Sequence, residues 1–294
     1  MTTFITGGAS QIGLGLARRL QEADRSVLFG SRAGRGTDGF AWVPFDWDDA
    51  STFENAFKRQ DIKPVESVYI LPAVAIDPLP KVAPFIDLAI EKGVKRFVVI
   101  SASDCVKGGP EMGAVHGYLE KVVLEKRGVI DYVALRPTWF IDNLSREPRI
   151  KEHDEIVSPL PKGRVPFIAV DDIVQAAFDA IVHEGVIDPE DEANSGPILI
   201  GPDLVSYDEV AQILSTVLGR PIKHRIISRD EALARYISYG LPEASAEFLV
   251  EAELNLDKGS AERLVTDDEF AVARKVGKLG VREYVEKNKN VWLK

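Results

Sequence analysis

The segment TFITGGASQIGLGLARRL, residues 3–20, places an apolar run, a turn of small residues and an amphipathic stretch one after another. Residues 3–6 predict a strand, and the spacing of apolar side chains over 12–23 predicts a helix. A glycine-rich turn between a strand and a helix is typical of phosphate-binding sites, because the start of the helix offers free N–H groups. The segment therefore indicates a nucleotide-binding α/β fold.

One position of this turn departs from the usual pattern. Gly7 and Gly8 allow the tight bend, and Gly13 lets the helix pack closely against the strand. Ser10 stands where such turns normally have the glycine that lets the backbone approach a pyrophosphate. Its hydroxyl could donate to a phosphate oxygen, or its side chain could crowd the nucleotide out. The turn is thus either a working nucleotide site or one kept only for folding.

Short apolar strands alternate with amphipathic helices along most of the chain. Further strands are expected at 26–30, 41–45, 67–71, 96–101, 131–136 and 197–200, and helices at 50–59, 84–92, 116–126, 171–182 and 206–218. Nearly continuous apolar strands that alternate with helices indicate a parallel sheet covered on both faces. Right-handed crossovers make this a doubly wound sheet of Rossmann type.

The regular alternation breaks twice, which suggests a second, smaller lobe. The segment 144–165 is charged and interrupted by prolines, so it is interpreted as a loop or lid; the chain after residue 225 is polar and helical. We therefore expect an α/β protein with a Rossmann-type domain and a smaller C-terminal substrate lobe. The domain would comprise 1–143 and 166–203, and the lobe 144–165 and 204–294.

Composition restricts the kind of partner. The chain has 294 residues and a net charge of −10, which argues against nucleic acid and anionic membranes. Its single cysteine, Cys105, excludes an intrachain disulfide and suits a reducing compartment. No spacing resembles a metal site, no signal peptide is expected, and no apolar run approaches the roughly 18 residues of a membrane span. We expect a cytoplasmic protein of undetermined oligomeric state.

The residues after the second expected strand bear on the cofactor. An acidic residue there normally binds a ribose 2′-hydroxyl, whereas an arginine neutralises a 2′-phosphate. This chain has Ser31 and Arg32, with Arg35 nearby and no acid, which favours NADP(H) over NAD(H); the arginines could also be solvated loop residues. Asp46 follows the third strand and could accept a hydrogen bond from the adenine, or cap the next helix.

Several longer stretches resemble the NmrA-like atypical short-chain dehydrogenases, and most nearly the fungal ergot-alkaloid dehydrogenases of the festuclavine synthase and agroclavine dehydrogenase type. They are GSR (30–32), FDW (45–47), GVKRFVVISAS (93–103), KGGPEMGAVH (107–116), LRPTWFIDN (135–143), GRVPFIAVDDI (163–173), GPDLVSYDEVAQIL (201–214) and VLGRPIKH (217–224). The resemblance implies NADP(H)-dependent reduction of an imine or iminium in alkaloid biosynthesis. The alternative that it also offers is a cofactor-independent isomerase or rearrangement catalyst, for example of an epoxide, and less strongly a dinucleotide-binding regulator.

Catalytic candidates follow the strand at 96–101, because ligands of a doubly wound sheet lie beyond the carboxyl ends of its strands. Asp104 would be a general acid if buried and a plain loop acid if exposed. Ser103 could hydrogen-bond the substrate. His116, which matches the family's histidine, could orient substrate, relay a proton, or make a structural hydrogen bond.

The last candidates lie on the helix at 116–126 and beyond the strand at 131–136. Tyr118 precedes Lys121 by three residues rather than the four of the standard dyad, so it is a proton donor or an ordinary helix residue. Trp139, Phe140 and Asn143 are expected to contact substrate, since aromatic side chains stack on flat rings; the aromatic pair could instead be core.

Overall fold

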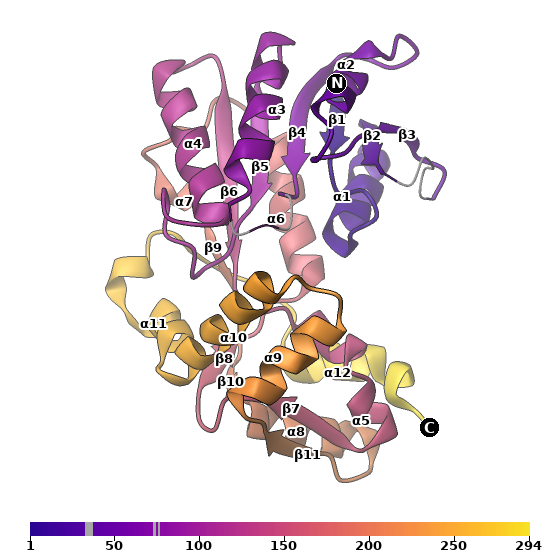
Figure 1. Cartoon of the computed structure of the whole chain (residues 1–294), viewed down its shortest axis with the longest axis vertical. Helices are drawn as coiled ribbons and strands as arrows, with labels where there is room; N and C mark the ends of the chain where they lie inside the picture. The colour runs from indigo at the N-terminus through magenta and orange to yellow at the C-terminus, as the bar shows by residue number, and fades with distance from the viewer. Residues whose placement is uncertain (33–37, 73–74, 76) are drawn as a thin grey trace. The chain divides into compact units, whose positions relative to one another are not determined.

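The computed structural model describes residues 1–32, 38–72, 75 and 77–294 (Figure 1). Eight strands form one parallel sheet in the order β12-β9-β6-β5-β4-β1-β2-β3, which confirms the Rossmann-type fold. Their bounds are β1 Thr2–Ile5, β2 Ser26–Ser31, β3 Ala41–Pro44, β4 Val65–Ile70, β5 Arg96–Ile100, β6 Asp131–Pro137, β9 Ile198–Ile200 and β12 Arg274–Val276.

Contacts divide the chain into two compact units. The first comprises 1–136 and 173–197, and the second 137–172 and 198–294. This division differs from the expected domain boundaries at 143, 166 and 203, since residues 137–143, 166–172 and 198–203 belong to the second unit. The reason is packing, because the chain that follows β6 joins the apolar core of the second unit through Ile141 and Leu144.

The first unit packs helices against its sheet. These helices are α1 Gln11–Glu22, α2 Asn55–Lys58, α3 Leu79–Glu91, α4 Met112–Glu125, most of α6 Val170–Val182, and α7 Glu192–Ser195. Phe85 of α3 and Leu119 of α4 share one core with Phe4 and Phe97 of the sheet. These apolar side chains pack α3 and α4 against the sheet.

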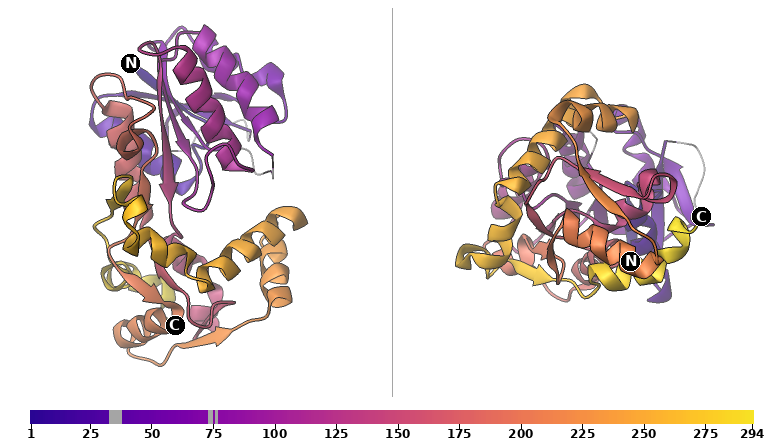
Figure 2. Two further views of the ribbon diagram at one scale, coloured as in Figure 1. Left: turned by 90° about the vertical axis from the view of Figure 1, so that its left-hand side faces the viewer. Right: turned by 90° about the horizontal axis from the view of Figure 1, so that it is seen from below.

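The second unit carries two small sheets and most of the remaining helices (Figure 2). Antiparallel β8 Arg164–Pro166 and β10 Leu204–Ser206 form one sheet, and parallel β7 Glu155–Ser158 and β11 Lys223–Ile226 form the other. The helices are α5 Pro148–Glu152, α8 Tyr207–Leu218, α9 Arg229–Ser238, α10 Glu243–Asp257, α11 Ser260–Thr266 and α12 Val281–Asn288. Packing of α9 beside α10 forms the small apolar core around Tyr236 and Val250.

Four expected elements differ from the structure. The helix expected over 84–92 begins five residues earlier, since α3 spans Leu79–Glu91. Helix α4 begins at Met112, so His116 lies in its second turn rather than at its start. The expected helix over 50–59 is a 3-10 turn, Ala50–Thr52, followed by the short α2. The segment 144–165 is not simply a loop, because it contains α5, β7 and β8; strand β7 pairs with β11 from far along the chain, which no local pattern indicates.

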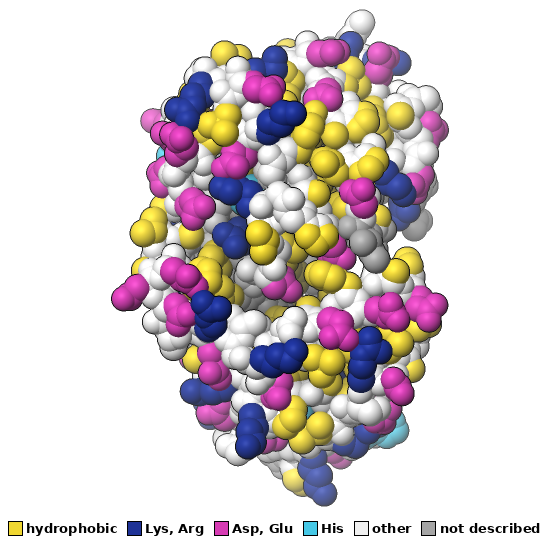
Figure 3. Space-filling view, turned by 60° about the vertical axis from the view of Figure 1, so that its left-hand side comes forward, with side chains coloured by type: hydrophobic (Ala, Val, Ile, Leu, Met, Phe, Trp, Pro, Cys, Tyr) yellow, Lys and Arg dark blue, Asp and Glu magenta, His cyan; other side chains and the backbone are white. Residues whose placement is uncertain are grey.

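Charge is mixed on the face drawn in Figure 3, where acidic and basic side chains lie interspersed. In the part of the chain that the structure describes, no helix is both long and apolar enough to cross a membrane.

Candidate functional site

The glycine turn is built as the sequence predicts. A side chain on Gly7 would meet Leu71, one on Gly8 would meet the ring of Phe29 at 2.4 Å, and one on Gly13 would lie 2.2 Å from the Gly7 carbonyl oxygen. These contacts leave no room for a Cβ at any of the three positions. The turn therefore brings the start of α1 as close to β1 as backbone packing allows.

Ser10 has a role that the sequence did not indicate. It is the N-cap of α1, where its Oγ accepts from the Gly13 N–H at 3.0 Å and donates to the Gly7 carbonyl oxygen at 2.7 Å. Its φ of −74° is ordinary for an L residue, so no glycine is required there. The single hydroxyl proton is used inside the turn, and the N–H groups of Gln11 and Ile12 remain without helical acceptors.

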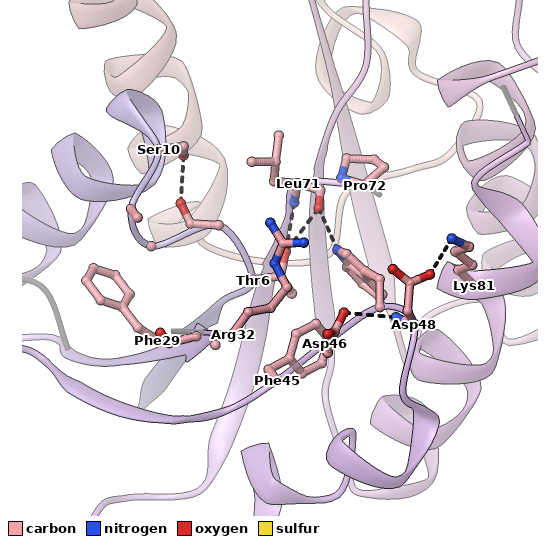
Figure 4. A pocket seen from close by; sticks show the side chains of 16 residues that line it. Thr6, Ser10, Phe29, Arg32, Phe45, Asp46, Asp48, Leu71, Pro72 and Lys81 are labelled. Carbon is pink, nitrogen blue, oxygen red and sulfur yellow. Dashed lines mark hydrogen bonds and ion pairs between the residues drawn. The ribbon is translucent and has the colours of Figure 1, made fainter. Parts of the chain in front are cut away.

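A cavity of about 490 Å³ adjoins this turn in the first unit (Figure 4). The turn, the ends of β2 and β4, and the segment after β3 line it. Arg32 lies at the end of β2, and Lys81 of α3 forms an ion pair with Asp48. Ser31 also lines the cavity, whereas Arg35 lies outside the described residues.

The segment after β3 forms one wall of this cavity. The Trp47 indole N–H donates to the Leu71 carbonyl oxygen at 3.1 Å, and its ring packs edge-on against Phe45. Asp46 lines the cavity, and one of its carboxylate oxygens accepts from the Asp48 N–H at 3.0 Å. The alternative that Asp46 caps the next helix is wrong, because Asp49 caps it through the Ser51 N–H.

The predicted acid at the end of β5 has a neighbour that the sequence analysis missed. Asp104 is exposed, although desolvation by the surrounding chain raises its pKa against the attraction of Arg136. Glu111 is the N-cap of α4, with φ 55° and ψ −132°, a strained conformation for any residue but glycine. Burial and the negative charge of Asp104 raise the pKa of Glu111 to about 7. Ser103 is half-buried in the same loop.

His116 is buried on α4 and does not line the first cavity. Its Nε2 lies 3.4 Å from the Tyr132 hydroxyl, and its Nδ1 has no partner among the described residues. Burial, helped by the positive charges of Arg136 and Lys107, lowers the pKa of His116 to about 3. The imidazole is therefore neutral, which favours the structural alternative.

Tyr118 points to α3. Its hydroxyl donates to the Asp87 carboxylate at 2.5 Å, and burial together with this bond raises the pKa of Tyr118 to about 12. A catalytic tyrosine needs the opposite shift. The contact favours the alternative of an ordinary helix residue, and no step is assigned to Tyr118 below.

Trp139, Phe140 and Asn143 all line a second cavity, of about 610 Å³, which lies entirely within the second unit. Tyr207 of α8 and Tyr236 of α9 line the same cavity. Aromatic rings thus come from several elements that are far apart in the sequence.

This second cavity also contains a buried ion pair. Arg235 Nη2 donates to both carboxylate oxygens of Glu253, at 3.0 and 3.2 Å, and Nη1 donates to the Val157 carbonyl oxygen at 2.9 Å. The side chains are only 17% and 2% exposed. Burial raises the pKa of Glu253, and Arg235 opposes that shift. The sequence analysis missed both residues, since on a polar helix they look like surface charges.

Comparisons with known proteins agree with this geometry, although no protein-family model matches the chain. The chain is 34% identical over 299 residues to agroclavine dehydrogenase of Claviceps fusiformis, covering 100% of this chain and 99% of the relative. It is also 34% identical over 305 residues to festuclavine dehydrogenase of Aspergillus fumigatus, covering 100% of both. Among solved structures, the NADP(H) complex of Citrobacter triphenylmethane reductase matches with a TM-score of 0.73 at 20% identity, over 98% of this chain and 99% of that one.

The doubly wound sheet, the glycine turn and the cavity beside it define a dinucleotide-binding protein of Rossmann type. Within that class, the chain belongs to the family of the agroclavine and festuclavine dehydrogenases. The predicted family and its oxidoreductase class are thereby confirmed.

Proposed function

We propose that the protein is an NADP(H)-dependent reductase of a small polycyclic substrate of alkaloid type, acting in the cytoplasm. The observation that carries the cofactor assignment is the first cavity, which is lined both by Arg32 and by a turn with no room for a Cβ at Gly7 or Gly8. When bound, the cofactor supplies a hydride to the imine or iminium carbon. The single, buried Cys105 suits the reducing compartment.

The residues of the first cavity fit this cofactor part by part. The N–H groups of Gln11 and Ile12 would hold the pyrophosphate at the positive end of α1. Arg32 would neutralise the 2′-phosphate, assisted by Ser31. Asp46 would accept from the adenine amino group.

The substrate would occupy the second cavity, against Trp139, Phe140 and Asn143. An iminium carbon accepts a hydride without a proton, so such a substrate needs no acid at that carbon. A neutral imine does need one, and we propose Asp104 and Glu111 as acids, with Ser103 as hydrogen-bond donor, because desolvation raises the pKa of both carboxyl groups. Their substitution should therefore slow the reduction of neutral imines more than that of iminium ions.

One observation favours a second candidate function. The raised pKa of Glu111 next to Asp104 is what an acid/base catalyst needs, so a cofactor-independent isomerase remains the alternative.

Titration of the purified protein with NADPH and NADH decides between the two. We expect saturable NADPH binding, at least tenfold tighter than NADH, with this preference lost in Arg32→Ala because the 2′-phosphate loses its counter-charge. Arg25→Ala is the matched control, since Arg25 lies in the same unit but does not line the first cavity. Absence of binding by either nucleotide would rule out the reductase and leave the isomerase.

A further inference from the structure

Aromatic side chains line the second cavity, and the buried ion pair of Arg235 and Glu253 lines it as well. We propose that the Glu253 carboxylate, held by Arg235, determines which substrate this cavity accepts, by receiving a hydrogen bond from a neutral N–H or O–H group on a flat multi-ring ligand. The inference rests on the proposed function in taking this cavity as the substrate site.

The carboxylate has acceptor capacity left. An ionised carboxylate can accept about four hydrogen bonds. Arg235 supplies two contacts, and the Tyr236 hydroxyl adds a third. One acceptor position on Glu253 is therefore available to a ligand in the cavity that the residue lines.

The ion pair is poorly explained by stability alone. Removing two charges from water costs about as much as their attraction returns, so a buried pair contributes little compared with apolar residues of the same size. Arg235 and Glu253 are nevertheless 17% and 2% exposed beside an aromatic cavity. A role in ligand recognition accounts for their position.

The charge balance of the cavity favours a neutral donor group at Glu253. Its charged lining residues are two of each sign, Arg146 and Arg235 against Glu147 and Glu253. A cation drawn to Glu253 would meet the Arg235 guanidinium bound to the same oxygens. A neutral donor gains the hydrogen bond without that repulsion, and its desolvation costs less.

The walls set the shape of the ligand. Trp139, Phe140, Tyr207 and Tyr236 supply ring faces and edges on which a planar ring system can stack. A cavity of about 610 Å³ lies in the range of small-molecule sites and has room for several fused rings.

Two tricyclic probes of nearly the same outline test the donor directly. Carbazole carries an N–H where dibenzofuran carries an oxygen. The ratio of their dissociation constants for the full-length protein therefore measures how much the N–H donor contributes to binding. We expect carbazole to bind at least tenfold more tightly, and the cation 10-methylacridinium to bind more weakly than carbazole.

The matched variants use two ion pairs that both join α9 to α10. Glu253→Leu alone would leave the buried Arg235 charge without its partner and could unfold the protein. The double variant Arg235→Met with Glu253→Leu avoids this, because it replaces the whole pair by apolar residues. In this double variant the dissociation constants of carbazole and dibenzofuran should be about equal. The control, Arg229→Met with Glu251→Leu, removes an exposed pair between the same helices and should keep the preference.

Equal affinities of carbazole and dibenzofuran for the unaltered protein would overturn the inference, as would a preference that survives in the Arg235 and Glu253 double variant. Tighter binding of 10-methylacridinium than of carbazole would overturn the choice of a neutral donor group at Glu253. NADPH affinity is measured on the same samples, so failure of the reductase proposal appears separately, as loss of nucleotide binding.

Discussion

Ser10 illustrates how a single residue can look like a defect in a motif and yet be part of it. Its side chain closes the turn from within, between Gly7 and Gly13, so we expect it neither to crowd a phosphate nor to donate to one. Capping by serine at this position also stabilises α1.

Substitution of Ser10 tests whether its side chain crowds a phosphate, binds one, or only caps α1. Ser10→Ala should lower the free energy of unfolding by about 1 kcal/mol and Ser10→Gly by a few tenths, because only the cap is lost. In both variants the NADPH dissociation constant should stay within about threefold of the original. Ser206→Ala, which removes the cap of α8, is the control for stability. Tighter binding in Ser10→Gly would show crowding, and much weaker binding in both would show a ligand role.

His116 predicts how stability depends on pH. Its pKa is lowered in the folded protein to about 3, so the unfolded chain binds the proton more readily below its ordinary pKa near 6.5. The stability that this residue contributes is complete above pH 6.5 and is lost as the pH falls, by about 1 kcal/mol per pH unit below about 6. Urea unfolding between pH 7 and 5 measures this loss.

The variant His116→Gln should show a shallower loss of stability over that range, because glutamine does not titrate. His153→Gln is the control, since His153 is exposed, and it should keep the original pH dependence. The same slope in all three proteins would contradict the buried, neutral assignment.

At the scale of elements, the start of α1 depends on its approach to β1. A Cβ on Gly13 would lie 2.2 Å from the Gly7 carbonyl oxygen, so Gly13→Ala must push the helix away. We expect a loss of 1–3 kcal/mol of stability, as for an overpacked core, and at least tenfold weaker NADPH binding by isothermal titration. Gln11→Ala changes an exposed position in the same helical turn and should alter neither quantity. An unchanged NADPH affinity in Gly13→Ala would mean that α1 does not hold the phosphates.

The neighbouring elements show where local patterns stop being informative. The expected strands of the sheet lie within one or two residues of β1 to β6, because continuous apolar runs are a local signal. Helix α4 begins four residues before its expected start, since the loop that precedes it folds back on itself: the Gly108 N–H donates to the Gly113 carbonyl oxygen. That loop geometry also strains Glu111 and places it near Asp104, which no spacing rule indicates.

On the scale of the whole molecule, the two units interleave in sequence while each encloses its own cavity. The first cavity could be anticipated, because its phosphate turn is contiguous and Arg32 follows a recognisable strand. The second could be anticipated only in part. Trp139, Phe140 and Asn143 stand together after β6, but Arg235 and Glu253 come from two helices that meet only through their own packing.

The sequence by itself determined the doubly wound sheet, the glycine turn and the family, because each rests on apolar periodicity or contiguous motifs that act over a few residues. Only the tertiary structure decided the capping role of Ser10, the contact between Tyr118 and Asp87, and the pairing of Arg235 with Glu253. Those outcomes depend on burial and on which distant side chains come within hydrogen-bond distance, and neither is encoded in the spacing of residues along the chain.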